Sequence, residues 1–171
     1  MRRHPSLQQA HDVPEATKRD LHIRTFSRSL PMALLRARES VMGRFRPMLR
    51  AHGLTEQKWR LLRALAAVDG KLRPMELSEM TCISRPSLSR LLKSLLALGL
   101  IQDSPHAHDQ RSTEFELTPA GLALVEEVAP DSERIYAEIE QLVGQQETER
   151  IYALCDRITE QLGAGEVGED E

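Results

Sequence analysis

The sequence predicts a mostly α-helical protein with a small β-wing, namely a winged helix-turn-helix with N- and C-terminal dimerisation helices. Three observations favour this fold class. Leucine dominates the apolar residues while aromatic residues make up only 4% of the chain, a composition that favours helices over strands. Two helical segments flank the short turn Cys82-Ile83, which is helix-turn-helix spacing. A polar loop between two strand-like segments follows directly, as in a β-hairpin.

Length, composition and charge indicate one domain in a reducing compartment. With 171 residues, of which 40% are hydrophobic, the chain can bury one core. We expect a cytoplasmic protein without a membrane segment, because no apolar run approaches the ~20 residues that span a bilayer and Cys82 and Cys155 lack disulfide-framework spacing. The net charge of −3 is polarised, with +8 on residues 1–70 and −11 on residues 121–171. The small net charge of the whole chain is therefore compatible with a basic surface on part of it.

The first part of the chain predicts a mobile arm followed by two helices. Residues 1–28 form the arm, which is polar and lacks periodicity. Apolar residues then recur at helical spacing over residues 31–51, where Pro47 is expected to kink the helix. Thr55 can cap the second helix, which Asp69-Gly70 ends. Its apolar stripe consists of Leu61, Leu62, Leu65 and Val68.

The helix-turn-helix provides the candidate DNA-reading surface. A short helix opens on Pro74 and is expected to bury Leu77 and Met80, and a second helix starts at Ser84. Arg can pair with guanine edges in a major groove, while Ser and Lys can bind phosphates; the alternative is an ordinary solvated helix face. The buried stripe is predicted to be Leu88, Leu91, Leu92 and Leu95, and the DNA-binding candidates of this helix are Ser84, Arg85, Pro86, Ser87, Ser89, Arg90 and Lys93.

Segments 100–103 and 113–117 predict the two strands of the wing, joined by a polar loop. In this loop Arg111 is the candidate for insertion into a minor groove, and Asp109 can hold its guanidinium in place. Alternatively, the two form a solvent-exposed pair of little consequence. His108 is a further DNA-binding candidate. His106 and His108 lack the third and fourth ligands of a zinc site, so we expect no metal.

Residues 119–162 predict two more helices separated by a break near Gly144. A winged helix does not need them, yet their apolar stripes must be buried. A second copy of the chain, related by a two-fold axis, is the simplest partner. Residues 163–171 are expected to be disordered. The stripes consist of Val128, Ile135, Ile139 and Leu142 in the first helix, and Ile151, Leu154, Cys155, Ile158 and Leu162 in the second.

The order of these elements, with Asp109-Gln110-Arg111 in the wing and Leu117-Thr118-Pro119 after it, resembles the MarR family of bacterial transcription regulators. The resemblance covers residues 29–162 as one domain, with the winged helix-turn-helix at about 54–118 and dimerisation helices at about 31–52 and 119–162. Stretches such as "LTEQKWRLLRAL" and "CISRPSLSRLL" are similar to the homoprotocatechuate- and 4-hydroxyphenylacetate-responsive regulators of degradative operons. The family wing usually has a basic residue where this chain has Ser112, which is expected to weaken phosphate contacts.

The residues also indicate a small-molecule site. Arg38 lies within the apolar stripe of its helix, and a buried guanidinium needs a partner. Trp59 and Arg63, four residues apart, can offer an apolar wall and a bidentate donor to an aromatic carboxylate, and Tyr136 could add a hydroxyl. Alternatively, Arg38 pairs with an acidic residue across the dimer, Trp59 is core and Arg63 is a surface residue. The resemblance implies a pocket at Ser29, Arg38, Trp59, Arg63 and Tyr136.

Taken with the resemblance, these features predict a homodimeric regulator that represses an aromatic-compound catabolic operon at a pseudo-palindromic DNA site. An arylacetic-type acid such as hydroxyphenylacetate or indoleacetate is the expected effector that releases it, and no cofactor is expected. No catalytic constellation is visible, so an enzyme is not predicted. One alternative is a thiol-responsive regulator acting through Cys82 or Cys155. Another is a protein-interaction module with a degenerate winged helix.

Overall fold

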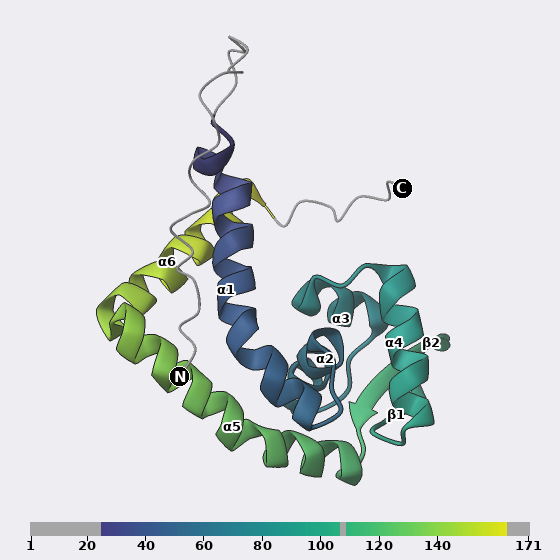
Figure 1. Ribbon diagram of the computed structural model, residues 1–171. Coiled ribbons are helices and arrows are strands. Elements are labelled where there is room, and N and C mark those ends of the chain that lie inside the picture. The colour runs from purple at the N-terminus through teal and green to yellow at the C-terminus, as the bar shows by residue number, and fades with distance from the viewer. Residues whose placement is uncertain (1–24, 107–108, 164–171) are drawn as a thin grey trace. The chain divides into compact units, whose positions relative to one another are not determined.

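The computed structural model describes residues 25–106 and 109–163 (Figure 1). The chain divides into two compact units, Met1–Arg38 and Glu39–Glu171. The described part of the first unit holds the 3-10 helix η3 (Phe26–Arg28) and the start of helix α1 (Leu30–Ala51). The rest of α1 and all later elements belong to the second unit.

Leucine-rich stripes build the core of the second unit. The end of α1 buries Phe45 and Leu49, and helix α2 (Glu56–Ala66) buries Trp59 together with Leu61, Leu62 and Leu65. The predicted cap is confirmed, because the Thr55 hydroxyl accepts a hydrogen bond from the Lys58 amide at 3.2 Å. Helix α2 ends at Ala66, earlier than the Asp69-Gly70 stop that the sequence predicts.

Helices α3 (Pro74–Thr81) and α4 (Arg85–Ala97) form the helix-turn-helix. Leu77 of α3 is buried as predicted, but Met80 is 50% exposed, so the prediction that both are core residues is wrong. An eight-residue helix among other helices has room to bury only part of its apolar face. Cys82 follows in the left-handed region at φ 51°, and its side chain is exposed rather than being the small buried residue usual in this turn.

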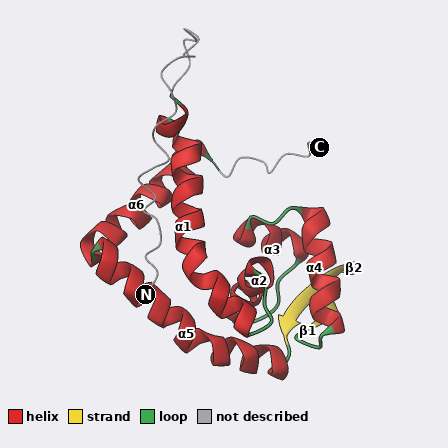
Figure 2. Cartoon of the chain, viewed as in Figure 1, coloured by secondary structure: helices red, strands yellow, loops and turns green. Residues whose placement is uncertain are grey.

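The wing is an antiparallel hairpin of β1 (Ile101–His106) and β2 (Asp109–Leu117), the only strands drawn in Figure 2. The predicted strands are confirmed but are longer than expected, since Asp109–Ser112 belong to β2 rather than to a loop. Leu72 adds a short bridge that the sequence does not reveal. Its amide and carbonyl each form a 2.9 Å hydrogen bond with Phe115, so the base of the hairpin is paired on both sides of β2.

Helices α5 (Pro119–Val143) and α6 (Gln145–Leu162) complete the unit, with the predicted break at Gly144. The Thr118 hydroxyl accepts from the Gly121 amide at 3.1 Å and donates to the Gly99 carbonyl at 2.6 Å. A side chain at position 121 would meet the Leu100 carbonyl oxygen at 1.9 Å, so only glycine fits this junction. Among the helices that the structure describes, none is long and apolar enough to cross a membrane.

The apolar stripe of α6 and the end of α5 lie largely on the surface of the single chain. Within the described residues, Leu142 is 70% and Leu162 is 76% exposed. Ile151, Tyr152 and Leu154 are about half exposed, and Cys155 is also exposed. The sequence therefore places an apolar face here correctly, and within the described residues much of it is exposed.

Candidate functional site

Helix α4 presents its polar residues to solvent along one side. Ser84 is the N-cap residue, and Arg85 and Pro86 open the helix. The predicted DNA-binding residues of α4 are exposed with the exception of Ser87, which is half-buried. The opposite side is core, with Leu88, Leu92 and Leu95 buried, whereas Leu91 is only partly buried. This arrangement leaves the N-terminal half of α4 free to enter a groove, as the second helix of a helix-turn-helix does.

The structure describes the predicted DNA-binding residues of the wing only in part. His108 lies outside the described residues. Asp109 and Arg111 belong to β2, but their side chains also lie outside the described part of the structure, so the proposed contact between them stays a prediction of the sequence. The base of the wing is anchored by Lys71, whose ammonium donates to the Ser104 hydroxyl at 2.7 Å and lies 3.5 Å from the Glu116 carboxylate.

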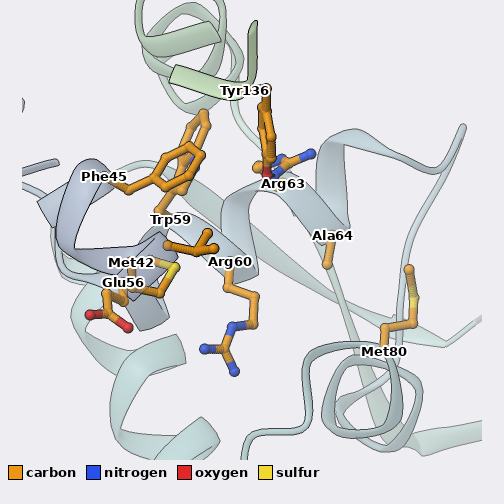
Figure 3. Close-up of a pocket in the computed structure, with 10 residues that line it drawn as sticks. Met42, Phe45, Glu56, Trp59, Arg60, Arg63, Ala64, Met80 and Tyr136 are labelled. Atoms are coloured by element: carbon orange, nitrogen blue, oxygen red, sulfur yellow. Dashed lines mark hydrogen bonds between the residues drawn. The ribbon is translucent and has the colours of Figure 1, made fainter. Parts of the chain in front are cut away.

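A cavity of about 360 Å³ opens between the end of α1, α2, α3 and α5 (Figure 3). This volume falls in the usual range for small-molecule sites. Its lining includes three aromatic side chains, two arginines and one glutamate, which Figure 3 draws around the same space. The lining residues are Val41, Met42, Phe45, Glu56, Trp59, Arg60, Arg63, Ala64, Met80 and Tyr136.

The predicted residues Trp59, Arg63 and Tyr136 meet in this cavity. One guanidinium nitrogen of Arg63 donates to the Tyr136 hydroxyl oxygen at 2.9 Å. The guanidinium carbon lies 6.0 Å from the centre of the Trp59 ring and 5.7 Å from the Tyr136 ring, within cation–π range. Phe45 packs against Tyr136 with ring centres 4.9 Å apart. A cation is thus fixed between aromatic faces, which suits a planar anionic ligand.

Glu56 places a carboxylate in the same cavity, on the side away from Arg63 in Figure 3. Arg46 of α1 bridges Glu56 and Glu39 through short hydrogen bonds. The hydrogen bonds that Arg46 donates, first to Glu39 and then to Glu56, raise the pKa of Arg46 above its usual range. Because a permanently charged guanidinium stays beside Glu56, the negative charge of Glu56 is compensated.

Arg60 connects the cavity to the helix-turn-helix. Its guanidinium donates to the Thr81 carbonyl oxygen at 2.9 Å, and Thr81 is the last residue of α3. Four residues that line the cavity were not among the predicted site residues, namely Phe45, Glu56, Arg60 and Met80. A usable signal was present, since Glu56, Arg60 and Arg63 are four and three residues apart and therefore share one face of α2.

Two pocket residues implied by the resemblance lie in the first compact unit. Ser29 is the C-cap residue of η3 and is half-buried. Arg38 is exposed, so the expectation of a buried guanidinium is wrong for the single chain. The physical reason is that its neighbours on the stripe, Leu34 and Val41, are themselves exposed at 43% and 39%. The assignment of Ser29 and Arg38 to a ligand site stays a prediction of the resemblance.

The remaining candidate groups are reactive thiols and metal ligands. Cys82 and Cys155 are free and exposed. Over residues 25–106 and 109–163, no group of three or more His, Cys, Asp or Glu side chains could hold a metal ion.

The fold agrees with three similarities to known proteins. A MarR family model matches residues 52–112. The chain is 36% identical to the HTH-type transcriptional regulator FarR of Neisseria gonorrhoeae over 77% of this chain and 88% of that protein. It is also 36% identical to the homoprotocatechuate degradative operon repressor of Escherichia coli, over 80% and 90% respectively.

A solved structure carries a ligand of the expected class. The structure of NadR in complex with 4-hydroxyphenylacetate matches with a TM-score of 0.71 and 32% identity, covering 81% of this chain and 97% of that one. The helix-turn-helix, the wing and these two relatives, of which the chain covers most of the length, lead to one conclusion: the chain belongs to the MarR family and is a winged-helix transcriptional regulator, not an enzyme.

Proposed function

We propose that this protein is a homodimeric repressor that leaves its DNA operator when a hydroxylated aromatic carboxylic acid binds the α2 cavity. The observation that carries the proposal is the Arg63 guanidinium held by the Tyr136 hydroxyl beside the Trp59 ring. A fixed guanidinium next to an aromatic wall offers a carboxylate a charge-assisted hydrogen bond and an arene a stacking face. The relatives that carry names of degradative operon repression and of hydroxyphenylacetate binding support the ligand class.

The ligand would lie across the cavity from Arg63 to Glu56. Its carboxylate pairs with Arg63 and accepts a hydrogen bond from the Tyr136 hydroxyl, while its ring packs on Trp59 and Phe45. The far end of the ring then faces Glu56 and Arg60, which line the same space. A ring hydroxyl at this end can donate to the Glu56 carboxylate and accept from the Arg60 guanidinium. The cavity therefore favours acids with a ring hydroxyl, such as 4-hydroxyphenylacetate, over unsubstituted ones.

Dimerisation supplies the cover for the apolar face of α6 and the symmetry for a pseudo-palindromic operator. The half-exposed side chains of Ile151 and Leu154 lie on a helix that buries only Thr148 in the single chain. Contiguous exposed apolar surface of this kind marks an interface. A two-fold dimer would carry two α4 helices to half-sites about one DNA turn apart, with Arg111 and Asp109 of each wing beside the minor groove.

Release from DNA requires only an ordinary coupling energy. If the acid prefers the dimer that does not bind DNA by roughly 2.7 kcal/mol, operator affinity falls by about 100-fold. The two groups of charged contacts, at Arg63 and at Glu56 with Arg60, lie on α2 between α5 and the helix-turn-helix. A ligand that bridges them is in position to favour one arrangement of these helices over another.

The proposal is tested with the protein's own tryptophan. Trp59 is the single tryptophan of the chain, so its fluorescence reports the cavity directly. Adding 4-hydroxyphenylacetate should change that fluorescence and, in parallel, lower the affinity of the protein for DNA from upstream of its own gene. A flat fluorescence titration with both 4-hydroxyphenylacetate and phenylacetate would remove the cavity assignment.

A thiol-responsive regulator is a second candidate, favoured by the exposure of both cysteines. Cys82 lies in the turn of the helix-turn-helix, where a modified thiol would disturb α4. The two functions separate in a protein that carries both Cys82→Ser and Cys155→Ser. Aryl-acid release from this variant would exclude the thiol mechanism, whereas peroxide-dependent and thiol-reversible release of the unmodified protein alone would favour it.

A further inference from the structure

The turn of the helix-turn-helix depends on a side chain from another helix. Thr81 ends α3, and the last carbonyl groups of a helix have no partner within the helix. The Thr81 carbonyl receives its hydrogen bond from Arg60 of α2 at 2.9 Å. A cation at this end is favoured by the helix dipole as well. The next residue, Cys82, turns the chain with a positive φ of 51°, which among the described residues other than glycine occurs only here.

The same guanidinium forms part of the cavity wall. Arg60 and Met80, the neighbour of Thr81, both line the cavity, and Figure 3 shows the Arg60 head group between Glu56 and the Met80 side of the space. Within the described residues, the Thr81 carbonyl is the acceptor to which Arg60 donates. A guanidinium has five N–H donors in a fixed plane, so turning it to meet a ligand changes the bond to Thr81.

We propose that Arg60 is the positioning residue through which an occupied cavity acts on the helix-turn-helix. This inference rests on the proposed function, because it requires an aromatic acid in the cavity. The ring hydroxyl of the acid accepts a hydrogen bond from Arg60 and draws the guanidinium toward Glu56. The Thr81 carbonyl then loses its partner, the left-handed turn at Cys82 relaxes, and α4 leaves the orientation that binds DNA.

The mechanism separates binding from release. An acid without a ring hydroxyl still contacts Arg63, Tyr136 and Trp59, so it occupies the cavity. It leaves the hydrogen bond from Arg60 to the Thr81 carbonyl intact. We therefore expect 4-hydroxyphenylacetate to be the stronger releasing agent even when phenylacetate is present at saturation. Coupling between the two sites is reciprocal, so operator DNA should weaken the binding of 4-hydroxyphenylacetate more than that of phenylacetate.

The experiment compares these two acids in the full-length protein and in Arg60→Gln. Saturation is established by Trp59 fluorescence, and operator affinity is measured with each acid and without acid. In the unmodified protein, 4-hydroxyphenylacetate should weaken operator binding about 100-fold, within the usual range of couplings, and phenylacetate several-fold less. Arg60→Gln should bind the operator more weakly without acid and should respond to both acids alike. Lys58→Gln removes a charge from the same helix outside the cavity and should keep the difference between the acids.

A second measurement observes the turn itself and needs no variant. The amide nitrogen of Cys82 shares a peptide bond with the Thr81 carbonyl, so its 15N chemical shift reports the hydrogen bond from Arg60. Saturating 4-hydroxyphenylacetate should move this resonance, and phenylacetate should move it much less. Equal shifts with both acids, or an unchanged difference between the acids in Arg60→Gln, would overturn the role of Arg60.

Failure of the proposed function has a different signature. If neither acid changes the fluorescence of Trp59 in the unmodified protein, the ligand class is wrong. The hydrogen bond from Arg60 to the turn is then tested by measuring the Arg60→Gln variant without acid. If this variant binds the operator more weakly than Lys58→Gln and its Cys82 resonance has moved, Arg60 stabilises the turn. If both values equal those of Lys58→Gln, Arg60 has no such role.

Discussion

Arg63 of α2 donates a 2.9 Å hydrogen bond to the hydroxyl of Tyr136 on α5. The two residues are 73 positions apart in the sequence, and the contact joins the helix that precedes the helix-turn-helix to the long helix that follows the wing. It also holds the Arg63 guanidinium where it can meet a carboxylate. The Tyr136 hydroxyl thus serves both the packing of α2 on α5 and the proposed ligand site.

Tyr136→Phe should reduce the affinity for 4-hydroxyphenylacetate by about tenfold, because it removes one hydrogen bond worth roughly 1–1.5 kcal/mol. Operator affinity without ligand should stay unchanged, since the ring still packs on Phe45. Isothermal titration calorimetry measures the first quantity and fluorescence anisotropy the second. Tyr152→Phe is the matched control, because it removes the hydroxyl of the chain's other tyrosine; an equal loss there would contradict a specific role for Tyr136.

Arg90 and Lys93 of α4 should separate base reading from phosphate binding. Arg90→Ala should lower operator affinity by about 10- to 100-fold if its fork pairs with a guanine. Lys93→Gln should weaken binding to any DNA and reduce the slope of log affinity against log salt by about one. Anisotropy titrations over a salt series measure both. Arg50→Ala, an exposed arginine in the last turn of α1, should change neither, and a similar loss there would point to a diffuse charge effect.

Leu154→Glu should split the dimer by placing a charge within the exposed apolar face of α6. Light scattering after size exclusion should find one 19.4 kDa chain where the unmodified protein has two. Operator binding should fall with it, because a single α4 reaches only one half-site. Leu122→Glu also adds a charge at an exposed leucine, but at the start of α5, and it should leave the dimer intact. A dimeric Leu154→Glu protein would show that α6 is covered in another way.

Gly121→Ala should destabilise the fold by about 3 kcal/mol, because the new methyl group would overlap the Leu100 carbonyl and force the backbone to move. Gly43→Ala is the matched control. Among the described residues beyond its own turn of the helix, nothing lies within 4 Å of the added methyl, and alanine within a helix is favoured by about 1 kcal/mol. The midpoint temperature of thermal unfolding should therefore fall in Gly121→Ala and rise in Gly43→Ala. Changes in the same direction would contradict the close approach at position 121.

Stability in acid should depend on Asp131. The His52 ring lies 3.3 Å from this carboxylate, and its hydrogen bond, followed by the effect of Arg134, lowers the pKa of Asp131 below the ordinary value of 3.8. A lowered pKa stabilises the fold above the ordinary value, and this contribution is lost as the pH falls through the folded-state pKa. Asp131→Asn should thus flatten the decline in urea stability below about pH 4. Glu133→Gln, on the same helix, should preserve that decline.

Much of the fold could be predicted because local patterns and packing agree. The Thr55 cap, the Gly144 break and the polar face of α4 each depend on residues within one or two turns. The extent of the wing could not be predicted in the same way. Alternation of apolar and polar residues reports a strand only where one face is buried, whereas β2 continues to Asp109, which pairs with His106 of β1.

Part of the cavity lining was predicted, from the residue types and from the resemblance to a known family. Trp59, Arg63 and Tyr136 come together as the resemblance implies, although the sequence alone leaves each with a structural alternative. Arg60 and Met80 were missed because their roles depend on how α2 and α3 meet. Periodicity identifies a helix face but not what covers it, and this is also why Arg38 is exposed despite its place on an apolar stripe.

The bridge between Leu72 and Phe115 divides the hairpin into a base and an outer part that differ in stability. At its base β2 has neighbours on both sides, whereas the outer part of β2 pairs with β1 alone. Amide hydrogen exchange should accordingly be slow at Phe115 and become faster along the hairpin. Insertions or deletions near the outer end would leave the register at the base unchanged. This division lets the length of the wing vary while the first residue of α5 keeps its position.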